Sequence, residues 1–531
     1  MAVFHYLRIK LFRMKLLFSA LALLMGAGSA VAQGNVTWSG QVASIVYQHC
    51  TPCHRPGEIG PMPFTNYQEA SAYASMIAFT VQTGYMPPWQ PDPAYSSLLD
   101  QRVMTPQEIQ TIQDWVQQGA LRGDPASEPA MPNYPIGSQL GQPDTVISMA
   151  QAYLHQGNNQ DLYRVFVLPT NLNETKKIKA IEFRAGNKSI VHHAILGIDV
   201  TGQGRMRDSL APGYGYTQFF GFGFTPTEDN WYGWAPGASA KYFPANIGKN
   251  LPAGADILVQ MHYAPTSVSQ TDSSSINLFY DRDNQVTRLE QIATISPLDL
   301  MNGPFIIPAN TLKSFKGRMR VSSDVSVMSV FPHMHLIGKD WKIYAVKPGN
   351  DTVNLISIPD WDFNWQGFYY FPRLIKLPAN SWIYAEATFD NRASNPNNPN
   401  SPPQNMSWGE NTTDEMYLCY LGFVPYQAGD ENIALSQNNA QNILKINNKL
   451  YPIFPNPASD RVNLGFQLNQ AGRIAVQLTD LQGRLVREIQ SGYYEPGQHV
   501  LPFDCSELSS GQYLVQLLTQ QGNYTQKLLK Q

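Results

Sequence analysis

Two histidines separated by a single residue, His333 and His335, stand between two largely apolar runs. Residues 325–330 before them and 341–346 after them are rich in β-branched and aromatic residues, which is typical of β-strands. Because side chains two residues apart point to the same face of a strand, both imidazoles are predicted to share one face of a sheet. Such a pair supplies two of the three ligands of a metal site, and a pair of structural histidines is the alternative.

Three further histidines lie in the same part of the chain. The pair His192-His193 and the single His262 each sit beside an apolar, strand-like run, and the chain has 10 histidines in total. Taken alone, each of the three is more typical of a structural residue. Adjacent residues of a strand face opposite ways, so His192 and His193 can meet one metal only at a β-bulge or a strand end. The clustering of histidines within residues 192–335 favours metal binding.

Length and composition limit the possible architectures. A chain of 531 residues is expected to form several domains. Its 39 glycines and 39 prolines, with only 15% charged residues, favour short strands joined by many turns. A net charge of −3 gives no indication of nucleic acid or an anionic membrane surface as a partner.

The first residues have the pattern of an export signal. Basic residues between Arg8 and Lys15 precede an apolar run at 16–25, and Ala30-Val31-Ala32 follows as a small-residue cleavage site. We therefore predict a signal peptide at 1–32. The alternative, a membrane anchor, is disfavoured because the apolar run is short for a bilayer, and no later stretch is long enough to span one. A secreted or cell-surface protein without a transmembrane segment is expected.

The motif Cys50-Thr51-Pro52-Cys53-His54 has the spacing at which haem c is attached covalently. Cys50 and Cys53 would form the thioethers, and His54 would be the proximal iron ligand. The alternatives are a redox dithiol and a disulfide. The other two cysteines, Cys419 and Cys505, are far apart in the sequence, so no disulfide framework is predicted.

Residues 33–128 resemble a small class I cytochrome c domain. The segment Met86-Pro87-Pro88-Trp89 is similar to the one that supplies the distal iron ligand in a cytochrome subfamily, which implies Met86 as sixth ligand. Weaker candidates for this ligand are Met62, Met76 and Met104. A capping box with proline at the first helical position is predicted at residues 105–108, and Gly119 is predicted to end this helix. Residues 129–143 are predicted to form a linker.

Residues 144–428 read as alternating short strands and turns, which indicates two β-sandwiches, at 144–295 and 296–428. The order of their motifs is His192-His193, then Gln260-Met261-His262-Tyr263, then His333-Met334-His335, then Asp414-Glu415-Met416. This set resembles the copper type II, ascorbate-dependent monooxygenases, a family that includes peptidylglycine α-hydroxylating monooxygenase and dopamine β-monooxygenase.

The resemblance implies two jelly-roll sandwiches that each hold one copper ion. His192, His193 and His262 would bind the electron-donating copper. His333, His335 and Met416 would bind the oxygen-activating copper and form the catalytic site. Imidazoles together with a soft thioether favour Cu(I), which fits that assignment. Ascorbate is the reductant that the family resemblance suggests.

Two positions depart from the family pattern. The peptide hydroxylase has an arginine two residues before its His-x-His and a polar residue two after its methionine; this chain has Phe331 and Leu418 there. These departures argue against a glycine-extended peptide as substrate. Glycine and aromatic residues at 213–222 and 231–234 are interpreted either as a self-packed loop or as a wall or lid over an apolar substrate.

The C-terminal region begins with a linker at 429–447 that is rich in Asn and Gln. Residues 448–531 have the alternation and glycine turns of a small β-sandwich. Motifs such as Tyr451-Pro452-Ile453-Phe454-Pro455-Asn456-Pro457 resemble the type A sorting domain of the type IX secretion system. That resemblance implies the secretion machinery as a partner. A carbohydrate-binding or adhesion sandwich is the alternative.

The sequence thus predicts a mainly β, multidomain chain: an N-terminal all-α cytochrome c domain, two jelly-roll sandwiches and a C-terminal Ig-like sandwich. The preferred hypothesis is a secreted copper monooxygenase that uses O₂ to hydroxylate a small-molecule or peptide substrate. Its own haem domain would feed electrons to the first copper. The alternative is a non-enzymatic haem–copper electron carrier or copper-binding surface protein. Met416 separates the two hypotheses, because a carrier gains nothing from a copper that O₂ can reach.

Overall fold

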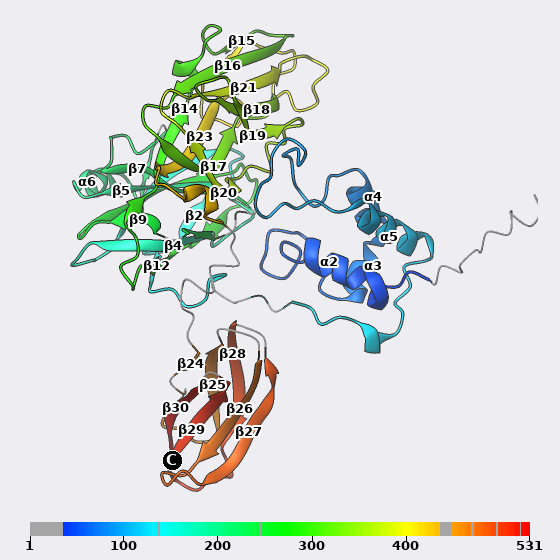
Figure 1. Ribbon diagram of the computed structural model, residues 1–531, viewed down its shortest axis with the longest axis vertical. Helices are drawn as coiled ribbons and strands as arrows, with labels where there is room; N and C mark the ends of the chain where they lie inside the picture. Colours follow the sequence, from blue (N-terminus) through cyan, green and yellow to red (C-terminus); the bar gives the residue numbers. More distant parts are fainter. Residues whose placement is uncertain are drawn as a thin grey trace, which may run out of the picture. The chain divides into compact units, whose positions relative to one another are not determined.

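The computed structural model describes residues 35–435 and 448–531, except 133, 135–137, 220, 237, 239, 245, 452, 454, 469–471, 495, 496 and 521. The predicted signal peptide and part of the predicted linkers lie outside the described residues. Most regular elements are strands, so the expectation of a mainly β chain is confirmed (Figure 1). The chain divides into two compact units, which are described separately.

The first unit is helical and comprises the described residues up to Pro56, with Gly60–Pro87 and Val103–Met131. Its helices are α2 (Ala43–His49), α3 (Tyr67–Ala72), α4 (Ala74–Gln82) and α5 (Pro106–Gln117), with shorter turns at η1 (Trp38–Val42) and η2 (Pro125–Ser127). Trp38 and Trp115 are fully buried at the centre of its apolar core. The predicted capping box is present, since Thr105 and Glu108 bond each other's backbone N–H groups at the start of α5.

Residues 88–102 interrupt this helical unit and pack against the second one. The N–H of Asp92 donates to the Ser357 carbonyl at 2.8 Å, and that of Leu99 to the Tyr370 carbonyl at 2.7 Å. Leu98 is buried in the core of the second unit. The sequence assigned all of 33–128 to one domain, and nothing in its composition marks 88–102 as part of a different core.

The first β-sandwich of the second unit has two main sheets and a small third one (Figure 1). One sheet has the order β1 (Thr145–Ser148), β12 (Ser275–Tyr280), β4 (Lys176–Arg184), β9 (Ile247–Leu251), β13 (Arg288–Leu289), with β8 (Lys241–Tyr242) paired to β4. The facing sheet has the order β6 (Tyr216–Thr217), β3 (Leu162–Pro169), β10 (Asp256–Tyr263), β5 (Val191–Asp199), β7 (Glu228–Trp234). The pair β2 (Tyr153–His155) and β11 (Gln270–Asp272) and the helix α6 (Gln203–Leu210) complete it.

The second sandwich is built in the same way. One sheet has the order β14 (Gln291–Ile295), β23 (Leu418–Pro425), β17 (Val325–His333), β20 (Tyr369–Leu377). The other has the order β16 (Leu312–Arg320), β21 (Trp382–Asp390), β18 (Gly338–Val346), β19 (Thr352–Ile358). The short pair β15 (Ile306–Ile307) and β22 (Met406–Ser407) and the turns η3 (Pro297–Asp299) and η4 (Asp430–Asn432) lie beside them.

The first two sandwiches share apolar contacts. Met328, Leu374 and Val424 belong to the second sandwich by sequence but are buried in the core cluster of the first. Across the same junction, Arg288 donates to the Asp430 carboxylate at 2.7 Å, and both side chains are buried. This packing allows residues from the two sandwiches to form one site.

The C-terminal strands form a third, separate sandwich with its own core (Figure 1). Its sheets are β24 (Lys449–Leu450), β25 (Arg461–Leu468), β28 (Gly497–Asp504) and β27 (Leu485–Tyr494), β26 (Gly472–Thr479), β29 (Gly511–Thr519), β30 (Gly522–Lys530). Cys505 is a buried free thiol here, and Cys419 is one on β23 of the second sandwich.

Replacement of Leu98 tests whether residues 88–102 belong to the β-rich unit. Leu98→Ala is expected to destabilise that unit by about 2–5 kcal/mol, because it opens a cavity in the core of the second sandwich. Calorimetry of the full chain should show this as a lower midpoint for the β-rich transition and an unchanged helical transition. Leu298→Ala, at a fully exposed leucine, is the control. A loss confined to the helical transition would contradict this assignment.

Candidate metal centres

A β-bulge brings the two adjacent histidines to one place. Strand β10 pairs with β5 so that His262 lies opposite His193, and the next residue, Tyr263, lies opposite Val191. His192 is therefore the extra residue of the bulged strand. This is the geometry that the sequence required if both histidines were to face one metal.

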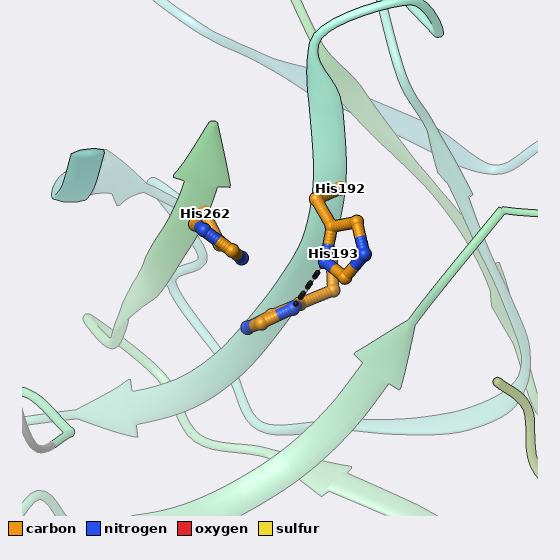
Figure 2. Close-up of side chains that lie close together, drawn as sticks. All are labelled: His192, His193 and His262. Carbon is orange, nitrogen blue, oxygen red and sulfur yellow. Dashed lines mark hydrogen bonds between the residues drawn. The ribbon is translucent and has the colours of Figure 1, made fainter. Parts of the chain in front are cut away.

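The three imidazoles form a compact cluster (Figure 2). One ring nitrogen from each of His192, His193 and His262 lies within 4.8 Å of the others. The Nδ1 atoms of His192 and His193 are 3.3 Å apart, and the ring of His262 lies 4.8 Å from that of His193. Distances of this order suit three nitrogen ligands around one ion.

The protonation states of the three histidines and the tautomer of His262 also suit metal binding. Burial lowers the pKa of His192 to about 3 and holds the pKa values of His193 and His262 below the usual range, so all three rings are neutral near pH 7. His262 Nε2 donates to Asp161 Oδ1 at 2.7 Å. Its Nδ1 is buried and has no hydrogen-bond partner among the described residues. An unpaired lone pair in a histidine cluster is a ready ligand, and the carboxylate behind it fixes the ring.

The second pair of histidines lies at the end of β17. The rings of His333 and His335 are 5.1 Å apart, as expected for residues on one face. His333 Nδ1 bonds Gln366 Oε1, and His335 Nδ1 donates to the carbonyl of Asp414 at 3.1 Å. Burial lowers the pKa of His333 to about 4 and that of His335 below its usual range. Each ring is therefore neutral, with its Nε2 lone pair left for a ligand.

Glu415 ties Met416 to His335. Its buried carboxylate accepts the backbone N–H groups of His335 at 2.9 Å, Ile337 at 2.8 Å and Met416 at 3.2 Å. Burial raises the pKa of Glu415 to about 8, and the three N–H donors oppose this rise. Met416 is buried and lines the same cavity as His333 and His335. The sequence analysis quoted Glu415 within its motif but assigned it no role.

A cavity of about 290 Å³ connects the two groups of residues. His192, His193, His333, His335 and Met416 all line it. The ring of Phe363 stacks on His192 at 4.9 Å and meets His335 edge-on at 5.5 Å. The phenyl ring of Phe363 thus contacts one histidine of each group.

Aromatic residues form much of the cavity wall. Phe331, one of the two positions that depart from the family pattern, packs against Phe368 at 4.6 Å and Tyr420 at 5.7 Å between ring centroids. The glycine- and aromatic-rich stretch at 231–234 is part of β7, and its residues line the cavity as a fixed wall. The cavity is therefore largely apolar.

Two hydrogen bonds connect the first histidine cluster to the segment that carries Met416. Asp161 accepts both His262 Nε2–H and, at 2.8 Å, the hydroxyl of Thr412. Tyr163 stacks on His262 at 4.2 Å and donates its hydroxyl to the Glu410 carbonyl at 2.6 Å. Sequence reasoning missed Asp161 and Tyr163. One feature could have indicated them: both lie at or next to the start of β3, and β3 pairs with β10, the strand that carries His262.

The helical unit holds the Cys-x-x-Cys-His motif just after α2. His54 Nδ1 donates to the Met62 carbonyl at 2.9 Å, and its ring stacks on Phe64 at 4.6 Å. This bond leaves Nε2 as the ligand atom. Burial raises the pKa of the Cys50 thiol to about 12, the opposite of the lowered pKa that a reactive dithiol needs.

Helix α4 has an apolar face that the helical core does not cover. Ile77, Ala78 and Val81 are buried, whereas Met76 is 50% and Phe79 65% exposed on the other side. Tyr73, which packs against Phe64, extends this face towards the ring of His54. Met86 follows α4, half-buried, with its N–H on the Thr80 carbonyl. An uncovered apolar face of this kind fits a large apolar cofactor.

Comparison with known proteins identifies the C-terminal sandwich. Residues 452–531 match the family described as "Secretion system C-terminal sorting domain". The predicted sorting domain is therefore confirmed, and the protein is exported by type IX secretion to the cell surface or beyond it. None of the helices among the described residues is long and apolar enough to cross a membrane.

About half of the chain also has a distant likeness to one curated protein. The protein "DBH-like monooxygenase protein 1" of Gallus gallus is 22% identical over 285 residues, which cover 49% of this chain and 44% of that protein. The chain thus spans less than half the length of this relative.

Two solved structures show only slight similarity. The infectious bursal disease virus VP2 subviral particle is 9% identical with a TM-score of 0.16, covering 56% of this chain and 75% of that one. Faecalibacterium prausnitzii β-glucuronidase is 11% identical with a TM-score of 0.13, covering 46% of each chain. Similarity at this level carries no functional argument.

Glu415 is expected to be essential for the shape of the second site. Glu415→Ala removes the acceptor of three buried backbone N–H groups and should destabilise the β-rich unit by about 3 kcal/mol or more. Glu415→Gln, which keeps one oxygen, should cost clearly less. Denaturant unfolding of the full chain measures both changes. Asp351→Ala, at an exposed loop carboxylate, is the control, and an equally small effect of Glu415→Ala would refute this role.

Proposed function

We propose that the protein is an exported, copper-dependent monooxygenase that hydroxylates a C–H bond of a small, largely apolar substrate. One observation carries the proposal: two histidine groups with free ring nitrogens face a single apolar cavity, one assembled by the bulge at His192 and one beside Met416. The distant likeness to a monooxygenase supports the same reaction class. Hydroxylation by O₂ takes two electrons and two protons in addition to the substrate and also yields water.

The residues present fit two copper ions. His192, His193 and His262 would hold one, since their rings are neutral and the Nδ1 of His262 has no other partner. His333, His335 and Met416 would hold the other, as a set of two imidazoles and one thioether suits Cu(I). Bound copper supplies one-electron transfer at the first site and O₂ activation at the second.

The surrounding residues position these ligands. Asp161 fixes the tautomer of His262, and Gln366 and the Asp414 carbonyl do the same for His333 and His335. The aromatic walls exclude water from the cavity, which protects a reactive intermediate from side reactions. A cavity large enough for a substrate also favours an enzyme over the alternative, an electron carrier.

We further propose that the helical unit is a c-type cytochrome domain and the internal electron source. Cys50 and Cys53 would bind the haem covalently, with His54 and Met86 as axial ligands. The Nδ1 bond of His54 and the uncovered face of α4 support this cofactor. Because the domain is part of the same chain, it would act at high effective concentration.

Copper content and turnover test the catalytic proposal. The mature protein should bind two copper ions, and His262→Ala or Met416→Ala should each lose about one while the fold is retained. Both variants should abolish ascorbate-driven O₂ consumption coupled to product formation, because each ligand set is incomplete. Elemental analysis and an oxygen electrode provide the measurements.

Met206→Ala, at an exposed methionine that does not line the cavity, is the matched control and should behave as the parent protein. Full turnover in Met416→Ala would refute the catalytic assignment. Copper without O₂ consumption would favour the electron carrier.

The haem proposal predicts a covalent adduct. The purified mature chain should show the mass of one attached haem and a c-type absorption spectrum. Cys50→Ser/Cys53→Ser should lose both, because no thioether can form, while copper content stays unchanged. Cys505→Ser is the control. A mature chain with the unmodified mass would contradict the proposal.

A further inference from the structure

A buried ion pair lies in the wall of the apolar cavity. Lys241 on β8 donates to both carboxylate oxygens of Glu290, at 2.6 and 2.7 Å. Their side chains are 6% and 0% exposed, and both residues line the cavity. Lys249 donates to the Glu290 carbonyl at 3.2 Å and pairs with Glu228 at 2.9 Å. The four charges balance, so this polar group is neutral as a whole.

The register of the sheet places this pair at one end of the cavity. On β17, Ser329, Phe331 and His333 share a face, and they lie opposite Gly422, Tyr420 and Leu418 of β23. A Cβ atom on Gly422 would lie 2.8 Å from Glu290 Oε1. The Glu290 carboxylate therefore lies beside Gly422 and its cross-strand partner Ser329. Ser329 and His333 are four residues apart on β17, which corresponds to about 13 Å along the strand.

A second polar group beside Gly422 has no partner. The Oγ of Ser329 is buried and makes no hydrogen bond within the described part of the chain. The same Gly422 Cβ position is 2.5 Å from this oxygen, so Ser329 Oγ and the Glu290 carboxylate adjoin one another. Lys241 has three N–H donors, of which Glu290 engages two. Ser329 is not among the residues that line the cavity, so Lys241 and Glu290 present the polar atoms to a ligand here. The Lys241 ammonium also lies over the rings of Phe243 and Tyr370.

A balanced ion pair discriminates against charged ligands. An ammonium or carboxylate placed beside it would add an uncompensated charge to a low-dielectric cavity, which is strongly unfavourable. A hydroxyl or carboxamide can donate and accept without that penalty. The cavity volume equals the space of about ten water molecules, which suits a single-ring compound better than a peptide.

We propose that the ligand of this cavity is a small, uncharged and mainly apolar molecule whose one hydroxyl or amide group binds at Lys241 and Glu290. Its far end then lies towards His333, at the opposite end of the cavity. That this ligand is the substrate rests on the proposed function. The binding preference itself depends only on the cavity.

Three matched probes with the same phenyl body test the head group: 4-phenylbutanamide, 4-phenylbutanoate and 4-phenylbutylamine. Titration calorimetry of the full-length mature protein, metal-free and copper-loaded, measures each affinity. The amide should bind at least about tenfold more tightly than either charged probe. Equal or tighter binding of the acid or the amine, or no binding of the amide at millimolar concentration, would overturn the proposal.

Charge variants give a sharper test. Glu290→Gln removes the acceptor of Lys241 and leaves an excess positive charge, which should shift the preference to the butanoate. Lys241→Met leaves Glu290 with only Lys249, whose Nζ lies 3.8 Å from Glu290 Oε2, and the excess negative charge should shift the preference to the amine. Since breaking a buried pair weakens the fold, Lys241→Met/Glu290→Gln is the safer variant. It should weaken binding of the amide about tenfold, while the two charged probes stay weak because the cavity is still neutral. Unchanged amide affinity in this double variant would refute the role of the pair.

The pair Arg205–Asp256 provides the control. Asp256 is buried in the first sandwich, and neither residue lines the cavity. Arg205→Met/Asp256→Asn should therefore leave all three affinities unchanged. An amide preference without copper or turnover would refute the proposed function alone. Copper and turnover with a charged substrate would refute this inference alone.

Discussion

The bulge in β5 is the local feature on which the first histidine cluster depends. In a regular strand His192 and His193 would point to opposite faces, and only one of them could meet His262. Because of the extra residue, both side chains can lie on the face of the sheet that carries His262, which is opposite His193 on β10. A shift of the pairing by one residue would carry His262 to the other face and separate it from Asp161 as well.

The second set of ligands depends on the junction between two sandwiches. Asp161 and Tyr163 start from the first sandwich and bond Thr412 and Glu410, which precede Met416 in the second. Phe363, from the second, stacks on His192 of the first. Hydrogen bonds and ring contacts thus cross the junction beside the cavity and hold the two histidine groups in one packed unit.

Sequence reasoning recovered features that have a period or a fixed spacing. The shared face of His333 and His335, the capping box at Thr105 and the need for a bulge at His192 all follow from local geometry. Asp161 and Gln366 were missed because each is a single polar residue in a loop, brought to its histidine by pairing of distant strands. The packing of residues 88–102 on the β-rich unit was missed for the same reason, since tertiary contacts alone decide it.

The distribution of charge around the cavity bears on specificity. Near His333 the cavity wall contains Phe331 and Leu418, neither of which can hold a carboxylate. At the other end the chain keeps Lys241 and Glu290, although apolar residues of similar volume in place of a buried pair are often neutral or stabilising. In our proposal, the buried pair is explained by the head group that it contacts in the cavity. The head group is then recognised at Lys241 and Glu290, and the apolar wall near His333 excludes water.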